Sequence, residues 1–423
     1  MEVETAVTER SAGQRQAARD LFHQREFMLL WGGQLLSQIG DQCLLIAAIT
    51  LITNLSASPL AILVPAISIA LPQLFFGLLG GVAADRWDRK WMMVISDVLR
   101  GLLVLAVLLV HTTAQLWILY LAAAGMALVG TFFYPARNAT IPNLVPKGLL
   151  LTANGLIQGT YIIALIIGPM VAGVAVDLWG LQAAIIFDSG TFLVSAVTII
   201  SLRVPPLQNG TSDLAVRGSM WGDMRTGLTF IRHNRLLRRA LYVAAVATLG
   251  IGSVVLLAIP HLRTQLGAGG LEYGGAMSVL GIGSVIGGLI ATRLSRRLST
   301  NSIVGGMLIA AGVAVIVFAY TRSYAVVLVS VMALGMCIVI ARGALDTITQ
   351  ALAPDEVRGR AQAAVSLIVT AGTALAEGFS ALMGHFLGVQ TMFVVAGAIT
   401  VAAGAAAIYA LREVAHLGHV GLR

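Results

Sequence analysis

Long apolar runs separated by short polar breaks dominate the chain from residue 27 to residue 411. Roughly 20 consecutive apolar residues are enough for a helix to cross a bilayer. The breaks are marked by proline, glycine or clustered charge, as at Ser58-Pro59 and Trp179-Gly180. The pattern predicts twelve spanning helices, over residues 27–53, 60–84, 91–111, 115–135, 151–176, 181–202, 237–260, 272–292, 302–320, 323–342, 362–386 and 389–411.

The composition supports an all-α integral membrane protein. Of 423 residues, 58% are hydrophobic and only 11% are charged, whereas soluble domains carry about 25% charged residues. A chain of this length cannot bury so much apolar surface in a water-soluble core. Cys43 and Cys337 lie inside apolar runs and suit packing better than a disulfide or a metal site.

The basic residues predict the orientation in the membrane. If both termini and alternate loops share one side, that side and the parts of the spans nearest to it hold 25 of the 27 Lys and Arg residues, with Arg100 inside the third span included. Only Arg263 and Arg322 fall opposite. The positive-inside bias then places both termini in the cytoplasm of a cell-membrane protein. The net charge of +8 is explained by this bias, so we expect no nucleic-acid partner. Residues 1–26 are polar and contain no apolar leader, and we expect the first span to direct insertion.

The longest loop, over residues 203–236, carries a second kind of helix. Apolar residues recur there at helical spacing, and they are Met220, Trp221, Met224, Leu228 and Ile231. This spacing predicts an amphipathic helix on the cytoplasmic surface of the membrane. A plain linker between two halves is the favoured interpretation, and a regulatory site is the alternative.

An internal repeat divides the chain in two. The segment Gly81–Lys90 aligns with Gly288–Arg297 at an offset of 207 residues, and 146–154 aligns with 354–362 at 208. Two matches at nearly one offset indicate two parallel six-helix pseudo-repeats, an arrangement known in secondary transporters. The predicted parts are a cytoplasmic segment 1–26, a first half 27–202, a cytoplasmic linker 203–236, a second half 237–411 and a cytoplasmic tail 412–423.

The first copy of the repeated segment resembles the signature loop of the major facilitator superfamily. Five residues match that loop, and they are Gly81, Asp85, Arg86, Arg89 and Lys90. Asp88 departs from the usual glycine there. The resemblance extends over residues 27–411 and is strongest to the drug:proton antiporters of the macrolide-efflux and enterobactin-exporter type.

A segment of the fifth span, residues 164–173, resembles the antiporter motif of the same family. Gly168, Pro169 and Gly173 match, and alanines replace two further glycines. The glycines permit close helix packing, and the proline removes one helical hydrogen bond. The resemblance implies export rather than import.

The signature loop has a physical role that its residues suggest. Asp85, at a cytoplasmic helix end, can accept hydrogen bonds from the N-terminus of the span that opens after Arg360. In the family an arginine of this loop pairs with an acid at the end of the fourth helix. The corresponding stretch here, Tyr134–Arg137, has no acid. Asp97, with Arg100 one turn on, is a candidate substitute.

Acidic residues at membrane depth are candidate functional residues because burying their charge is costly. Asp41 lies near mid-membrane in the first span, on a polar stripe with Gln34, Ser37 and Gln38. The resemblance implies that the first, fourth, seventh and tenth spans line a central cavity, so the stripe should face it. A carboxyl group shielded from water can exchange a proton near neutral pH. The hypothesis is that Asp41 carries the coupling proton, and the alternative is a structural acid.

Other membrane-depth residues are weaker candidates. Glu377 lies midway along the eleventh span, and Asp188, two turns inside the sixth, could pair with a cationic substrate. Arg342 and Asp346 are one turn apart, and a local ion pair is favoured over a gate. A polar stripe in the fifth span could line the substrate path or join helices, and it consists of Asn154, Gln158 and Tyr161.

The sequence therefore predicts a transporter rather than an enzyme. No phosphate-binding loop, catalytic constellation, cofactor motif or metal-ligand spacing is present. The predicted function is proton-coupled export of a hydrophobic or amphipathic small molecule by alternating access, with the protein acting as a monomer in the lipid bilayer. A dedicated metabolite or lipid transporter of the same fold is the first alternative, and a non-transporting receptor or scaffold is the second.

The repeat generates a testable prediction, because its second copy has Thr292 where the first has Asp85. If the acid closes a cytoplasmic latch, Asp85→Asn impairs transport more than Thr292→Ala does. Transport rates of the two variants in vesicles provide the measurement. Equal effects would reduce the loop to an orientation signal.

Overall fold

The computed structural model describes residues 19–56, 58–203 and 220–414. For some helical residues, including Gly81 and Asp85, it describes the backbone but not the side-chain environment. Every regular element in these ranges is an α-helix or a 3₁₀ turn, as the sequence predicts. Two compact units divide the chain, Met1–Ser56 with Val64–Asn209 and Ala57–Leu63 with Gly210–Arg423. Each unit is described by itself.

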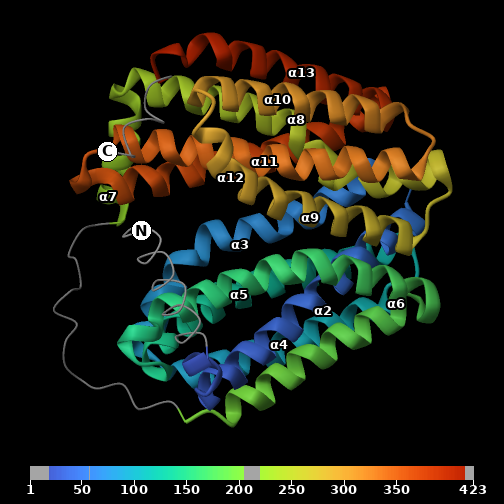
Figure 1. The fold of residues 1–423 in the computed structure, drawn as a ribbon. Helices are drawn as coiled ribbons and strands as arrows, with labels where there is room; N and C mark the ends of the chain where they lie inside the picture. The colour runs from blue at the N-terminus through green and yellow to red at the C-terminus, as the bar shows by residue number, and fades with distance from the viewer. Residues whose placement is uncertain (1–18, 57, 204–219, 415–423) are drawn as a thin grey trace. The chain divides into compact units, whose positions relative to one another are not determined.

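The helices of each unit run alongside one another (Figure 1). The first unit contains α2 (Arg25–Leu55), most of α3 (Pro59–Arg86), α4 (Arg89–Ala106), α5 (Leu116–Leu144) and α6 (Leu150–Ile200). The second contains α7 (Met220–His233), α8 (Arg235–Leu266), α9 (Gly270–Ser295), α10 (Thr300–Tyr320), α11 (Tyr324–Leu352), α12 (Asp355–Leu387) and α13 (Val389–Ala410).

Nine helices within the described ranges are long and apolar enough to cross a membrane. One of them, over 147–200, holds two helices joined at Gly180, whose φ of 83° interrupts the helical backbone. Gly388 joins α12 to α13 with a φ of 82°. A positive φ favours glycine because glycine has no Cβ. The exact number of twelve spans stays a prediction.

The two units repeat one packing scheme. In the first, α2 packs on α6, α4 packs on α6 and α4 packs on α5. In the second, α8 packs on α13, α10 packs on α13 and α10 packs on α11. The glycine joints lie 208 residues apart, close to the offset of the sequence repeat. The duplication read from the signature loop therefore extends to the helices and to their contacts.

Several helices are longer than the apolar runs that predict them. α5 continues through Pro135 and Pro142 to Leu144 instead of ending at residue 135, and α11 continues to Leu352. A run of apolar residues marks only the part of a helix that lies in the hydrocarbon core of the bilayer. The backbone can remain helical beyond that part. The predicted breaks at Ser58-Pro59 and Gly180 are confirmed.

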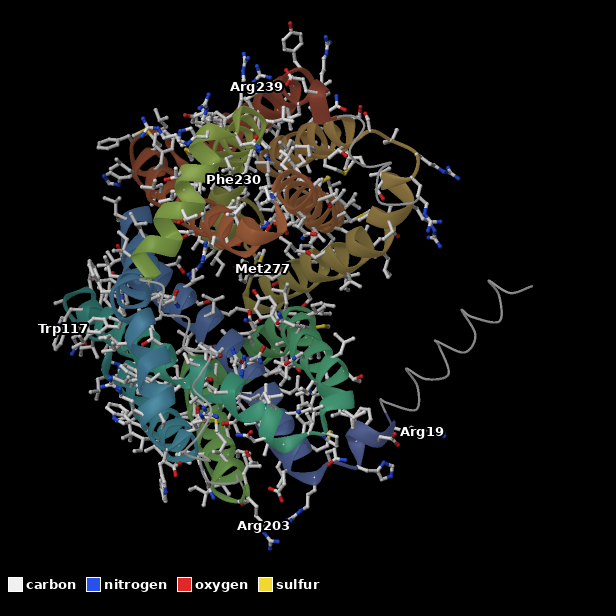
Figure 2. The ribbon with its side chains drawn as sticks, turned by 90° about the vertical axis from the view of Figure 1, so that its left-hand side faces the viewer. Arg19, Trp117, Arg203, Phe230, Arg239 and Met277 are labelled. Atoms are coloured by element: carbon white, nitrogen blue, oxygen red, sulfur yellow. The ribbon has the colours of Figure 1, made fainter. Side chains whose placement is uncertain are left out.

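The predicted amphipathic helix is present as α7, which packs on α12 and α8. Ile231 is buried and, with Phe230 beside it, belongs to the apolar core of the second unit (Figure 2). Leu228 is exposed, and the side chains of Met220, Trp221 and Met224 lie outside the described residues. The C-terminal turn of α7 therefore packs on protein, and a membrane contact remains a prediction for the rest.

Glycine brings α10 and α13 into backbone contact. A Cβ on Gly312 would lie 2.5 Å from the carbonyl oxygen of Gly397, and one on Gly404 would lie 2.7 Å from that of Gly305. Helices within a membrane associate largely through such close packing, because the hydrophobic effect does not distinguish lipid from protein there. The same helix also offers a contrast, since a Cβ on Gly306 would meet nothing within 4 Å.

This contrast predicts opposite effects of one substitution on stability. Gly312→Ala should destabilise the protein by about 1–3 kcal/mol, because the added methyl group forces α10 and α13 apart. Gly306→Ala should be neutral or stabilising, since it adds no clash and favours the helix by roughly 0.5–1 kcal/mol. Thermal unfolding of the two purified variants in one detergent tests both, and equal midpoints would contradict the packing described here.

Candidate functional site

A polar cavity of about 290 Å³ lies within the first unit. Residues of α2, α5 and α6 form its wall. They are Gln38, Asp41 and Gln42 from α2, Tyr134 and Arg137 from α5, and Ile157, Gln158, Tyr161 and Ala164 from α6. The wall therefore carries one acid, one base, three amides and two phenols, which can bind polar groups of a small molecule or exchange a proton.

The polar stripe of α2 is divided between two environments. Gln38 and Asp41 line this cavity of the first unit, and the central cavity expected from the first, fourth, seventh and tenth spans stays a prediction. Gln34 and Ser37 are buried instead, each 4% exposed, and they are not part of the cavity wall. Gln34 donates a hydrogen bond to the Ser195 hydroxyl of α6 at 3.3 Å. Gln34 and Ser37 precede Gln38 and Asp41 by about one helical turn, so the surroundings of the stripe change along the axis of α2.

Glycine allows α2 and α6 to approach closely beside the cavity. A Cβ on Gly168, in the antiporter motif, would lie 2.5 Å from Cγ of Gln42. A Cβ on Gly40 would collide with the side chains of Asp188 and Thr191. The predicted role of Gly168 in close packing is consistent with this contact. Pro169 and Gly173 are also buried in α6.

Arg137 forms the basic side of the cavity wall. Its guanidinium lies over the Tyr134 ring at 5.2 Å and donates hydrogen bonds to Asn138 Oδ1 at 3.1 Å and Gln34 Oε1 at 3.5 Å. Gln34 therefore acts on the cavity indirectly, because it helps to hold Arg137.

A buried ion pair lies next to the cavity, between α4 and its neighbours. Arg100 donates to Asp97 Oδ1 at 2.5 Å, and the two side chains are 6% and 0% exposed. The guanidinium also lies over the rings of Phe133 and Phe192, at 4.2 and 4.8 Å. This is the pair that the sequence offers as a substitute for the family's relay. Among the described residues, Oδ2 of Asp97 has no hydrogen-bond partner.

Asp188 is fully buried beside the cavity, at 0% exposure, and does not line it. The Thr191 hydroxyl donates to its backbone oxygen at 2.7 Å and lies 3.5 Å from Oδ1. Its Oδ2 has no partner within the described ranges. A direct pairing with a substrate cation, as the sequence suggests, would need this carboxyl group to become accessible.

Three carboxyl groups and one guanidinium form one electrostatic cluster. Asp41 interacts with Arg100, and Asp97 and Asp188 each interact with Asp41. Arg137 adds a second positive charge on the cavity wall. Even with Arg137 included, the acids outnumber the bases by one. Because uncompensated charge is costly at membrane depth, the cluster is suited to hold at least one proton.

The basic residues of the signature loop bind backbone carbonyls near helix ends. Arg89 donates to Ala84 O at 3.1 Å and to Ala139 O at 2.9 Å, and Lys90 donates to Leu202 O at 2.8 Å. The last carbonyls of a helix lack partners within it and attract cations. Arg89 therefore joins the ends of α3 and α5 through a carbonyl where the family uses an acid.

The remaining residues of the loop have different positions. Asp88, the departure from the family pattern, caps α4 by accepting a hydrogen bond from the Trp91 amide at 3.0 Å. Arg86 is exposed at the end of α3. The structure does not describe the surroundings of Gly81 or the side chain of Asp85, so the predicted latch remains a prediction.

Glu377 belongs to a different site, within the second unit. It lines a cavity of about 490 Å³ between α8, α10, α11 and α12. Arg342 also lines this cavity and forms an ion pair with Asp346, with Nε 3.5 Å from Oδ1. The local pair favoured by the sequence is thus confirmed. Glu377 thus lines a cavity of the second unit, whereas Asp41 lines a cavity of the first.

Three residues that line the polar cavity are not among the candidates predicted from the sequence, and they are Gln42, Tyr134 and Arg137. The predicted fourth span ends at residue 135 and so leaves out Arg137, whereas α5 continues to Leu144 and includes it. Gln158 and Tyr161 of the predicted stripe line the cavity and Asn154 does not, while the role of this stripe in a substrate path stays a prediction. In the described part of the chain, no three His, Cys, Asp or Glu side chains are placed to hold a metal ion.

Comparisons with known proteins agree with this architecture. The model of the Major Facilitator Superfamily matches residues 30–376 and 241–420. The uncharacterized MFS-type transporter YkuC of Bacillus subtilis is 27% identical, over 75% of this chain and 76% of its own. Macrolide efflux protein A of Streptococcus pyogenes is 27% identical, over 52% of this chain and 55% of its own.

A solved structure shows the same fold. The crystal structure of a bacterial homolog of the human lysosomal transporter Spinster, in an inward-facing and unoccupied conformation, aligns with a TM-score of 0.75 and 16% identity. The alignment covers 93% of this chain and 98% of that one. The family model, the duplicated helices and this alignment identify a multi-pass membrane transporter. The chain belongs to the Major Facilitator Superfamily.

Proposed function

We propose that the protein exports a hydrophobic or amphipathic small molecule from the cytoplasm in exchange for protons, by alternating access. In this proposal it acts as a monomer in the cell membrane, with both termini in the cytoplasm. The observation that carries the proposal is the position of Asp41, on the wall of a polar cavity and in electrostatic contact with Arg100, Asp97 and Asp188.

The three acids of the cluster have different surroundings, which supports different roles for them. The Asp97 carboxyl group is paired with Arg100, and the guanidinium of Arg100 packs on two aromatic rings, so Asp97 already has a partner inside the protein. Asp188 is closed off from the cavity. Asp41 is the acid of this cluster that lines the cavity. It is therefore the acid best placed to take up a proton from one side of the membrane and release it to the other.

Two further observations support export. The antiporter motif residues Gly168, Pro169 and Gly173 are buried in α6, with Gly168 against the cavity-lining Gln42. One relative is named for macrolide efflux. In the proposed cycle, ionised Asp41 favours the state that binds substrate from the cytoplasm. Proton binding from outside neutralises Asp41 and favours release of the substrate. In this cycle the proton and the substrate bind preferentially to different states of the protein, so binding of one shifts the equilibrium away from binding of the other.

Removing the charge of Asp41 should uncouple transport from the proton gradient. Substrates are first identified by comparing drug susceptibility of cells that express or lack the protein, with and without a proton uncoupler. Accumulation of such a compound is then measured in inverted vesicles with an acidic interior. Asp41→Asn should reduce gradient-driven accumulation by about tenfold or more, as expected for loss of an essential proton-transfer group.

A matched control is Asp177→Asn, which removes an exposed acid from α6 and should leave accumulation unchanged. Substrate exchange without a gradient should persist in Asp41→Asn, because asparagine resembles the protonated acid. Gradient-driven accumulation at the wild-type rate in that variant would exclude Asp41 as the proton carrier. A susceptibility panel without any difference would favour a dedicated metabolite or lipid transporter.

The buried ion pair generates a second prediction. Arg100→Gln should lower stability by roughly 3–5 kcal/mol, because it leaves the Asp97 carboxylate unpaired in the interior. The double variant Asp97→Asn with Arg100→Gln should recover most of this loss, since it removes both charges. Thermal unfolding of both variants provides the measurement. If the double variant is no more stable than Arg100→Gln alone, the pair is not the source of the effect.

A further inference from the structure

The cavity of the second unit differs chemically from the polar cavity of the first. Sixteen residues line its volume of about 490 Å³, and twelve of them are Ala, Val, Leu or Ile. A cavity of this size and character is typical of small-molecule sites. The four polar lining residues are Thr248, Arg342, Thr373 and Glu377. The polar groups of a ligand for this cavity are therefore determined by the charge, donors and acceptors of these four side chains that have no partner within the protein.

Three of the four polar groups already have partners. Arg342 pairs with Asp346 and donates to the Ser366 hydroxyl at 3.2 Å. Thr373 donates to Val369 O at 3.0 Å, and Thr248 donates to a carbonyl of its own helix. Each threonine hydroxyl has one hydrogen, which it already donates within the protein, so towards a ligand it can only accept a hydrogen bond.

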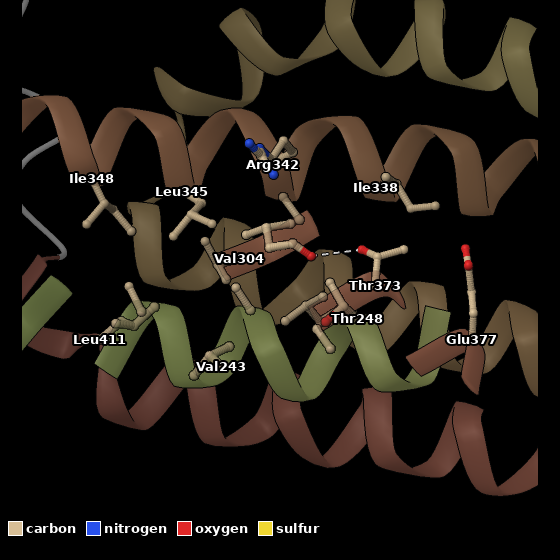
Figure 3. A pocket seen from close by; sticks show the side chains of 16 residues that line it. Val243, Thr248, Val304, Ile338, Arg342, Leu345, Ile348, Thr373, Glu377 and Leu411 are labelled. Carbon is tan, nitrogen blue, oxygen red and sulfur yellow. Dashed lines mark hydrogen bonds between the residues drawn. The ribbon is translucent and has the colours of Figure 1, made fainter. Parts of the chain in front are cut away.

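Glu377 is the exception. It is about midway along α12, and in the described part of the chain no hydrogen bond or ion pair involves its carboxylate. Figure 3 shows it at one end of the cavity, with Ile348 and Leu411 at the other. Because Arg342 is neutralised by Asp346, the cavity wall carries the single negative charge of Glu377 among otherwise aliphatic side chains.

From this arrangement we infer that the second unit binds a lipophilic monocation, with its apolar body among the aliphatic side chains and its positive charge beside Glu377. The inference rests on the proposed function and specifies a substrate class for it. An anion would face the carboxylate and the lone pairs of Thr248 and Thr373. A neutral apolar molecule would leave the carboxylate uncompensated at membrane depth, which costs free energy.

The two units thus have separate parts in the proposal. The offset of 207 places Thr248 where the first unit has Asp41, so the repeat itself does not supply the acid of the second cavity. Glu377 corresponds to Pro169 at the offset of 208 that holds for the segments on either side of it. The acid of the second cavity therefore lies on α12, whereas α8 is the helix that corresponds to the helix of Asp41.

The test uses two probes of nearly equal size and opposite charge, tetraphenylphosphonium and tetraphenylborate. Equilibrium binding is measured to the purified full-length protein in lipid nanodiscs, without a proton gradient. Tetraphenylphosphonium should bind, and Glu377→Gln should weaken its binding about tenfold or more, as expected for loss of one charge-assisted contact. Glu377→Asp, which keeps the charge, should remain within roughly threefold of the wild-type affinity. Tetraphenylborate should bind more weakly than the cation.

The matched control is Glu413→Gln, which removes a largely exposed acid of the same unit that pairs with Arg239. It should leave cation binding unchanged. A second variant, Leu308→Trp, tests the location, because a bulky ring in the cavity should weaken cation binding even with Glu377 intact. Thermal unfolding of each variant confirms that it is folded.

Unchanged cation binding in folded Glu377→Gln, or anion binding as tight as cation binding, would overturn the inference. Either result would leave the proton-coupled function intact, because that function is tested by gradient-driven accumulation in Asp41→Asn. Conversely, cation binding that depends on Glu377 would stand even if transport proved independent of the proton gradient.

Discussion

The guanidinium of Arg100 determines the charge balance inside the first unit. It is held by Asp97 at 2.5 Å and lies between the rings of Phe133 and Phe192, so it cannot move to another partner without leaving a buried carboxylate behind. Its single charge cannot neutralise Asp97, Asp41 and Asp188 together. The interior therefore contains more acid than base, and proton binding is the simplest way to remove the excess.

A duplicated scaffold holds two chemically different cavities. The helices and their packing pairs repeat at an offset near 207, yet the charge cluster does not. Asp97 of the first unit corresponds to Val304 of the second, which lines the aliphatic cavity. One copy of the fold thus provides a polar chamber with linked acids, and the other provides an apolar chamber with one acid. In the function proposed above, such divergence would allow proton binding and substrate binding to change independently.

Close backbone contact makes both arrangements possible. In the first unit Gly40 leaves room for Asp188 and Thr191 against α2, which brings an acid of α6 close to Asp41. In the second unit Gly312 brings α10 against α13. Within a bilayer, helices gain little from the hydrophobic effect and depend on such contacts. Small residues therefore determine which polar side chains come within electrostatic range of one another.

The sequence by itself determined the fold class, the duplication and the main helix breaks, and it identified Asp41 as an acid at membrane depth. These follow from local quantities, because a spanning helix, a proline break and a buried acid are each visible within about 20 residues. The tertiary structure alone decided which polar residues meet. It placed Glu377 on the wall of a cavity of the second unit. In the first unit it withdrew Asp188 from the polar cavity and added Arg137 to the cavity wall. These placements depend on how each helix is rotated about its axis and how closely glycine lets its neighbours approach, and neither quantity is encoded within a single span.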